Sequence, residues 1–344
     1  MAMDERKQRI LQAIVTLYTE DGEPIGSNLL SRHIDMALSS ATLRNEMAAL
    51  TKLGLLEQPH TSAGRVPSTA GYRYYIDNII DLQANLSSED AALIDRLFDS
   101  FDFDPEKLAQ ETAKSLSDLT GYAVVTTTPK AEDMRIAHYE VMQVGRFTVA
   151  VLAVTSAGGV RTRVAKLDAE VTAKEIALLL LQLNRYLCFV SAADVTPALI
   201  QELLDEMGEN GISLYPAVSA AVTLLREAGK PNVYLEGQQY LFQYKELEQS
   251  MATILELFGN TEAIQSLISP VTDRTTVLLG DDLPRYSMPG ITIATKRYWA
   301  GSGLTGAIGL IGPTRMNYNE IIPKLEYFSQ KLSHLITSGG KKER

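Results

Sequence analysis

The sequence holds a single cysteine in 344 residues and no hydrophobic run long enough to span a membrane. Cys188 lies in the apolar stretch 178–190, so neither a disulfide framework nor a cysteine-based metal site can form. Gln182, Asn184 and Arg185 interrupt that stretch, which excludes a membrane span. The N-terminus is too polar and too acidic for a signal peptide. We therefore expect a cytoplasmic protein with no membrane partner.

The motifs of common enzymes are also missing. There is no phosphate-binding loop ending in Gly-Lys-Ser/Thr and no Gly-x-Ser-x-Gly nucleophile elbow. The segment 301–306 matches the Gly-x-Gly-x-x-Gly dinucleotide fingerprint, but a strand is predicted to follow it where that fingerprint requires a helix. We interpret this segment as a glycine-rich hairpin. His60 is not expected to be a metal ligand or a catalytic base, because no second histidine or carboxylate cluster accompanies it. The sequence predicts no enzyme, no cofactor and no metal site.

What is present is an ordinary globular composition, with 45% hydrophobic and 22% charged residues, long enough for two or three domains. The net charge of −10 argues at first sight against nucleic acid, because affinity for DNA comes largely from cations that neutralise phosphates. The charge of the N-terminal region differs from this overall value. Residues 36–75 carry four basic and two acidic side chains, with His60 beside them. This segment is a weak basic patch.

The N-terminal region predicts three short helices followed by a wing. Apolar residues at helical spacing, cap residues and glycine stops place the helices at 5–19, at 27–34 with Ser27 as its cap, and from Ser39 or Ser40 to 53. Strands at 55–58 and 65–67 flank a turn-rich loop, and Ser68 or Thr69 can cap a helix over 71–82. Three helices with short connections and a wing are typical of a winged helix-turn-helix.

The rest of the chain alternates between helix-rich and strand-rich blocks. A helical interruption between two strand blocks suggests an α/β, sensor-like domain that carries an insertion. The expected helices are 88–101, 105–119, 173–189, 197–207, 216–227, 246–258 and 319–336. The expected strands are 122–127, 134–144, 146–154, 160–167, 233–235, 275–279, 291–298 and 304–311.

The third helix has the pattern of a DNA-reading helix. Leu43, Met47 and Leu50 fall on one face, which leaves an opposite face of small and polar residues. Alanines there allow close approach to a major groove, and Asn45 has the paired donor and acceptor that match adenine. Lys52 suits phosphate contact. The predicted DNA-binding residues are Ser39, Ser40, Ala41, Thr42, Arg44, Asn45, Ala48, Lys52, His60, Thr61, Ser62, Arg65 and Arg73.

The segments 39–47, 55–67 and 71–75 closely resemble the HrcA family of heat-inducible transcription repressors. The likeness continues to 311–316 and Tyr318 before the last helix, so it covers nearly the whole chain. Two positions depart from the family pattern. Ser40 stands where proline is usual, and Ala37 stands where glycine is common. Serine is a good N-terminal helix residue, so we expect the fold to survive both changes.

The resemblance implies an α+β multidomain protein with three parts. These are a winged helix-turn-helix at 1–82, a GAF-like α/β domain at 83–155 and 232–344, and an inserted dimerisation domain at 156–231. It further implies that the protein represses chaperone operons by binding an inverted-repeat operator in double-stranded DNA as a homodimer, with activity that depends on the chaperonin. A metabolite-sensing regulator, with a small ligand in the GAF-like domain, is the alternative function. The helix at 173–189 is either a dimer interface or an ordinary core helix.

Overall fold

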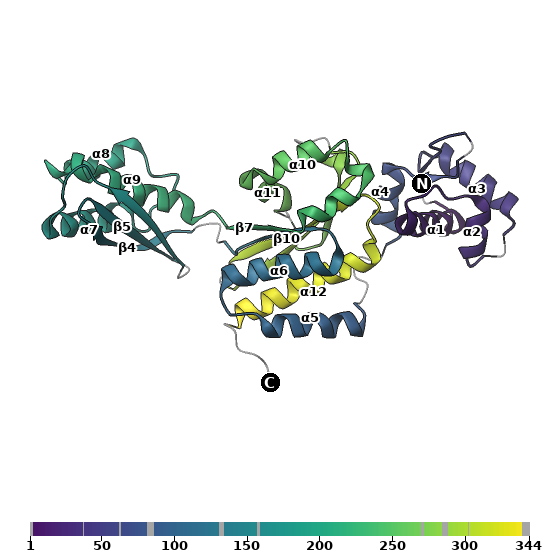
Figure 1. Cartoon of the computed structure of the whole chain (residues 1–344), viewed down its shortest axis with the longest axis horizontal. Helices are drawn as coiled ribbons and strands as arrows, with labels where there is room; N and C mark the ends of the chain where they lie inside the picture. The colour runs from purple at the N-terminus through teal and green to yellow at the C-terminus, as the bar shows by residue number, and fades with distance from the viewer. Residues whose placement is uncertain are drawn as a thin grey trace. The chain divides into compact units, whose positions relative to one another are not determined.

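The computed structural model divides the chain into two compact units (Figure 1). The first unit contains residues 1–128, 233–301 and 306–344, and the second contains 129–232 and 302–305. The second unit therefore interrupts the first in sequence. The residues that the structure describes are 3–36, 38–61, 63–80, 86–130, 134–156, 159–269, 272–283, 288–301 and 303–338.

The first unit begins with a winged helix-turn-helix. Helix α1 (Glu5–Asp21) packs on α2 (Ser27–His33) and α3 (Ser40–Lys52), and Ile10, Leu11, Ile14, Leu30 and Leu43 are fully buried among them. Strands β1 (Leu56–Glu57) and β2 (Val66–Pro67) pair antiparallel, and α4 (Thr69–Asn78) follows. The three predicted helices and the wing are confirmed.

The predicted helix starts are confirmed at two places and wrong at one. Ser39 caps α3 and Ser68 caps α4, since each serine hydroxyl accepts a backbone N–H three residues on. Ser27 does not cap α2. It is the first helical residue, Gly26 occupies the cap position, and the Ser27 side chain is buried.

A five-stranded sheet forms the larger part of the first unit. The strand order is β7-β3-β10-β9-β8, and β3 pairs antiparallel with both β7 and β10. In Figure 1, α5, α6 and α12 lie on one side of this sheet and α10 and α11 on the other. The strands are β3 (Ala123–Thr127), β7 (Val233–Glu236), β8 (Thr276–Leu279), β9 (Ile291–Trp299) and β10 (Thr305–Pro313). The helices are α5 (Ser88–Ser100), α6 (Pro105–Thr120), α10 (Met251–Phe258), α11 (Thr261–Ile268) and α12 (Tyr318–Thr337).

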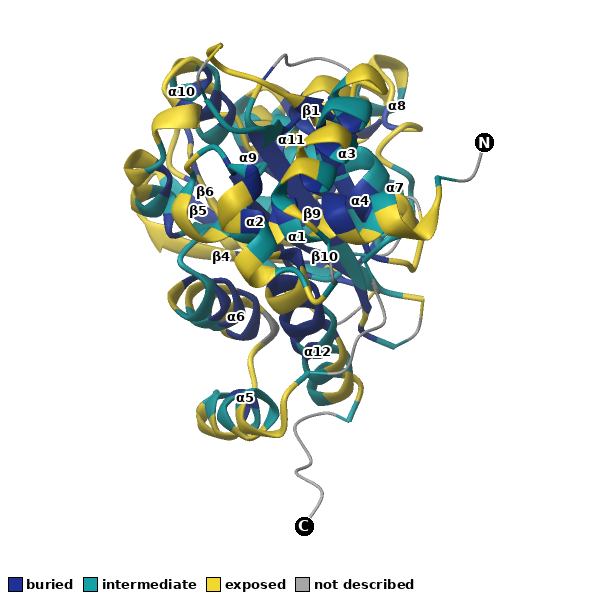
Figure 2. Cartoon of the chain, turned by 90° about the vertical axis from the view of Figure 1, so that its right-hand side faces the viewer, coloured by how far each residue is buried: buried dark blue, intermediate teal, exposed yellow. Residues whose placement is uncertain are grey.

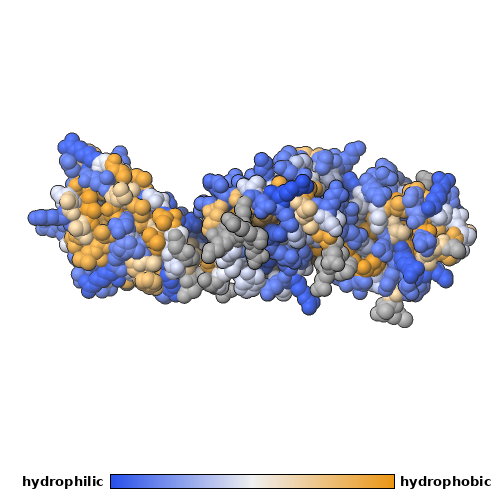
Figure 3. Space-filling view, turned by 90° about the horizontal axis from the view of Figure 1, so that it is seen from below, coloured by the Kyte–Doolittle hydropathy of each residue, from blue (hydrophilic) through white to orange (hydrophobic). Residues whose placement is uncertain are grey.

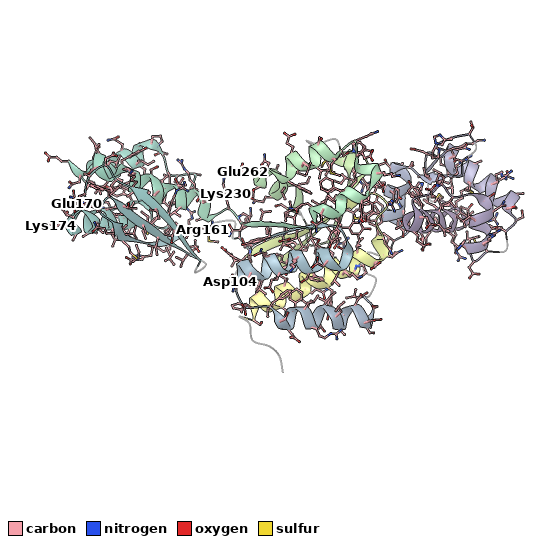
Figure 4. The ribbon with its side chains drawn as sticks, viewed as in Figure 1. Asp104, Arg161, Glu170, Lys174, Lys230 and Glu262 are labelled. Atoms are coloured by element: carbon pink, nitrogen blue, oxygen red, sulfur yellow. The ribbon has the colours of Figure 1, made fainter. Side chains whose placement is uncertain are left out.

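The second unit is a three-stranded antiparallel sheet with helices on one face. Its strands β4 (Ile136–Gly145), β5 (Thr148–Thr155) and β6 (Val160–Lys166) follow one another in order. Helices α7 (Ala173–Leu187) and α9 (Asn210–Ala228) contact the sheet, and α8 (Pro197–Asp205) packs against both. Asn184 on α7 exchanges hydrogen bonds with the backbone of Tyr139 on β4, at 2.9 and 3.0 Å. Arg161 of β6 donates to the Lys230 carbonyl at 3.1 Å (Figure 4).

The expected boundary between 155 and 156 does not match the division into units. It would separate β5 from β6, whereas the structure pairs them from Thr148 with Lys166 to Val154 with Val160. Since a hydrogen-bonded ladder joins β4, β5 and β6, the compact unit begins at 129 instead.

Three other predicted elements need correction. Helix α9 begins at Asn210, so Pro216, the expected first residue, lies inside it. The expected helix at 246–258 is a short 3-10 turn at Lys245–Leu247 followed by α10. Helix α11 was not predicted, although Asn260 caps it by accepting the Ala263 N–H at 3.1 Å. By contrast, strand β10 does follow the glycine-rich segment after β9, as the hairpin interpretation requires.

Within the first unit, a buried tyrosine cluster joins α4 to the start of α12. The ring of Tyr318 lies 6.5 Å from that of Tyr72 and 6.4 Å from that of Tyr75. The Tyr75 hydroxyl accepts the Asn319 amide at 3.0 Å, whereas the buried Tyr72 hydroxyl has no partner among the described residues. Burial raises the pKa of Tyr72 well above its usual value, so the hydroxyl stays neutral.

Replacing each of these two tyrosines by phenylalanine should have opposite effects on the free energy of unfolding. Tyr75→Phe should lower the free energy of unfolding by about 1 kcal/mol, because Asn319 loses its acceptor. Tyr72→Phe should be neutral or stabilising, because it removes an unpaired buried hydroxyl. Urea unfolding followed by fluorescence of Trp299, the only tryptophan, reports on this unit. A larger loss for Tyr72→Phe than for Tyr75→Phe would contradict the assignment.

Candidate DNA-binding surface

Helix α3 is held by one buried face, which fixes the residues on its other side. Leu43, Met47 and Leu50 are buried against the winged-helix core. Ser39 caps the helix by accepting the Thr42 N–H at 3.1 Å. Rotation of α3 would expose its apolar stripe, so this burial sets which side chains point to solvent.

The exposed face contains most of the residues predicted to read DNA. Ala41, Arg44, Asn45 and Lys52 are exposed, together with the cap Ser39. Ser40, Thr42 and Ala48 are half-buried at the edges of this face. Figure 2 looks onto the winged helix and shows exposed positions on α2 and α3 in yellow.

The only acidic residue of α3 is turned toward α1. The Glu46 carboxylate lies 3.6 Å from Arg6 and 3.4 Å from Lys7 of α1, and it is mostly buried. These contacts join the two helices and neutralise the charge that would otherwise repel phosphate. Sequence reasoning missed this pair, although a lone glutamate in a basic segment could have indicated it.

The wing brings a second group of predicted residues beside α3. His60 and Thr61 are exposed in the loop after β1. The Gln58 side chain donates to the carbonyls of Thr61 and Ala63, at 2.9 and 3.1 Å, and so braces the loop. Ser62 lies outside the described residues, as does Ala37.

Arg65 lies at the base of the wing, directly before β2. Its backbone bridges Ile25, with two N–H···O bonds of 2.9 Å. Its side chain donates to the Thr51 hydroxyl of α3 at 3.0 Å. At the neighbouring Gly64, a Cβ atom would lie 2.4 Å from the Ile25 carbonyl carbon, so only glycine fits this close approach. Arg65 therefore ties the wing to α3.

Arg73 is not grouped with the other predicted residues. It lies on α4, and its guanidinium donates to the Val277 carbonyl of β8 at 3.2 Å and forms an ion pair with Asp282. Val277 lies on β8 and Asp282 in the 3-10 turn that follows it, both in the same unit. A cation expected to meet DNA is therefore engaged within the chain.

A groove of about 410 Å³ separates α3 from the wing and the start of α2. Among the described residues that line it, Arg44 and Arg65 are the cations and none is a carboxylate. The arrangement suits a polyanion, because cations and amide donors face an open concave surface. The lining residues are Ile25, Gly26, Ser27, Asn28, Arg44, Met47, Gln58, Thr61, Ala63, Gly64 and Arg65.

Two other kinds of site are absent from the part of the chain that the structure describes. There, no cluster of three histidine, cysteine, aspartate or glutamate residues could hold a metal ion. No helix in that same part is long and apolar enough to cross a membrane.

Known protein families match both the winged helix and most of the chain that follows it. Residues 3–78 match the family described as "Winged helix-turn-helix transcription repressor, HrcA DNA-binding", and residues 106–322 match the "HrcA protein C terminal domain". The chain belongs to the HrcA family. It therefore carries a DNA-binding winged helix and belongs to a family of transcription repressors, which are not enzymes.

Relatives support the HrcA assignment over nearly the full length. A heat-inducible transcription repressor of Brevibacillus brevis is 33% identical over 98% of both chains. Another from Caldanaerobacter subterraneus is 31% identical over 98% of both. A crystal structure of a hypothetical protein shares the fold, with a TM-score of 0.63 at 23% identity over 98% of this chain and 100% of that one.

The exposed face of α3 predicts distinct roles for Asn45 and Lys52. Asn45→Ala should lose about 1 to 3 kcal/mol on a specific site and lower the ratio of specific to random binding. Lys52→Ala should weaken binding to all DNA and reduce the salt slope by about one. Asn78→Ala, at an exposed position of α4, is the matched control. An unchanged specificity ratio for Asn45→Ala would exclude its role in reading bases.

Proposed function

We propose that this protein represses heat-shock, or chaperone, operons in the cytoplasm by binding an inverted-repeat operator as a homodimer, with activity dependent on the chaperonin. The observation that carries the proposal is the exposed face of α3 beside the wing, in a chain whose relatives are named heat-inducible transcription repressors. Footprinting on the upstream regions of chaperone operons tests it. Protection of an inverted repeat is expected, and protection of no such region would contradict it.

In this proposal α3 enters the major groove. Ala41 and Ala48 let its backbone approach the base edges, Asn45 pairs with adenine, and Arg44 reaches guanine or a phosphate. Lys52 contacts phosphate, as do the hydroxyls near the start of the helix. Those hydroxyls are Ser39, Ser40 and Thr42. His60 and Thr61 bring the wing to the adjacent backbone, and Arg65 acts by holding the wing against α3.

Binding as a dimer follows from the size of one recognition helix. One helix reads too few base pairs to define a site in a genome, so a palindromic operator is matched by a two-fold symmetric pair. The second unit has the surface that favours this role. It holds less than a third of the chain, but more than half of the exposed large hydrophobic side chains among the described residues. In Figure 3 apolar residues gather over this unit.

The apolar surface includes the open face of the three-stranded sheet. Helices α7 and α9 cover the other face, where Tyr139, Val149 and Val151 are buried. On the open face Ala150 pairs with Met142 on one side and with Val164 on the other. The residues of this face with apolar or threonine side chains are Met142, Thr148, Ala150, Leu152, Val154, Val160, Thr162 and Val164, and the face also carries His138, Glu140 and Lys166. An uncovered apolar sheet face is typical of an interface.

Two substitutions separate this sheet face from helix α7 as the interface. Val164 on β6 and Leu181 on α7 are equally exposed, at 62%. Val164→Glu should give a monomer at micromolar concentration and weaken operator binding at least about tenfold, because a charge would be buried in the interface. Leu181→Glu should remain dimeric. Sedimentation velocity measures both, and the reverse result would place the interface on α7, which otherwise buries its Leu179, Leu183 and Leu187 face as a core helix.

Dependence on the chaperonin has a physical basis in the order of the strands. Strand β3 pairs with β7 and with β10, so residues 123–127 must find partners across the whole second unit. Non-local pairing of this kind folds slowly and exposes sheet edges to aggregation. Such a chain is a natural client of a chaperonin. When heat-denatured proteins occupy the chaperonin, less repressor is active and the operons are transcribed.

This feedback predicts how the active fraction responds at constant temperature. Purified protein should bind its operator weakly, chaperonin with ATP should raise the active fraction, and excess unfolded protein should cancel the gain. Titration with operator duplex measures the active fraction. An active fraction that ignores chaperonin at every temperature tested would contradict the feedback while leaving the DNA-binding assignment intact.

A further inference from the structure

The C-terminal turn of α1 contains no cation of its own. Its last residues, Glu20 and Asp21, are acidic, and no basic residue lies in its last turn. Because the C-terminus of a helix carries partial negative charge, acidic residues there are unfavourable and a cation is stabilising. The capping Gly22 has a left-handed backbone (φ 70°), and its N–H donates to the Tyr18 carbonyl at 2.9 Å. The next carbonyl, that of Thr19, accepts from a side chain.

Arg315, which precedes α12, supplies that cation. Its Nη1 donates to the Thr19 carbonyl at 3.2 Å, and its Nε donates to the Glu246 carboxylate at 2.5 Å. The guanidinium also lies 5.2 Å from the centre of the Tyr244 ring. A Cβ atom on Gly22 would lie 3.4 Å from the guanidinium carbon, so the two elements are in close contact. Arg315 therefore joins α1 to the segment before α12 and to the segment 244–246. Both segments belong to the sheet part, which is the five-stranded sheet of the first unit with its surrounding helices.

The opposite end of α1 holds the recognition helix. Arg6 and Lys7 lie in its first turn and pair with Glu46 of α3. Since α1 is a continuous helix of 17 residues, an anchor at its C-terminus restrains the segment that holds α3. Arg73 adds a second contact to the sheet through Asp282 and Val277.

We propose that Arg315 is a positioning residue for DNA binding, which fixes the orientation of α1 and therefore of α3 without touching DNA. This inference rests on the proposed reading of an inverted repeat by two recognition helices. Both helices must be held at the spacing of the half-sites, and a loosely held winged helix would lose freedom on binding. The cost applies in full only when both half-sites are engaged together.

Arg315→Gln tests this role on two duplexes, one with the full inverted repeat and one with a single half-site. Affinity for the full repeat should fall at least about tenfold, with little change on the half-site and an unchanged salt slope. Equal losses on both duplexes with a reduced slope would mean that Arg315 contacts DNA, which overturns the proposal. Arg297→Gln is the control, because Arg297 also pairs with a carboxylate, Asp273, in the sheet part.

The double substitution Arg315→Gln with Glu246→Gln separates positioning from simple charge balance. If Arg315 only neutralises Glu246, removing both groups should restore affinity for the full repeat. We expect no restoration, because the bond to the Thr19 carbonyl stays broken. Full restoration would overturn the proposal.

A measurement without DNA keeps this proposal separate from the proposed function. Spin labels at the exposed positions Gln12→Cys on α1 and Ser266→Cys on α11, with Cys188→Ala, report the distance between the winged helix and the sheet part. Arg315→Gln should broaden the distance distribution, whereas Arg297→Gln should not. An unchanged distribution overturns the positioning role, even if DNA binding is confirmed. Failure to bind any DNA would contradict only the proposed function.

Discussion

The DNA-binding surface depends on the burial of one stripe of α3. Leu43, Met47 and Leu50 lie in the winged-helix core, and burying each side chain contributes about 1.5 to 3 kcal/mol. Together they fix the rotation of the helix about its own axis. The exposed set then follows, because a helix cannot bury that stripe without presenting Ala41, Asn45 and Lys52 to solvent.

Three sets of side-chain contacts hold the winged helix in place. Glu46 joins α3 to α1 and Arg65 joins the wing to α3 through Thr51, while Arg315 and Arg73 join the domain to the sheet. Glu46, Arg73 and Arg315 are paired with opposite charges inside the chain and do not direct their charge toward DNA. A count of charges along the sequence overstates the cations available to phosphate, since it cannot see which of them are already paired.

Most elements of the fold could be predicted from the sequence, and the failures have local causes. Caps and periodicity placed α1, α3 and α12, whereas Pro216 hid the first turns of α9 because proline normally marks a helix start. The boundary of the second unit was misplaced, because strand patterns do not say which strands pair. The roles of Arg65 and Arg73 depend on partners that are distant in the sequence, Val277 and Asp282 among them. Such contacts leave no trace in local spacing.

The proposed repression requires α3 to be the element that enters DNA, and affinity cleavage tests this directly. An iron chelate attached through Ala41→Cys, with Cys188→Ala, should cut within each half of the proposed inverted repeat, because position 41 faces outward at the start of α3. The same chelate at Ala70→Cys on α4 is the control and should cut weakly or not at all. Strong cleavage from position 70 with none from position 41 would contradict the account.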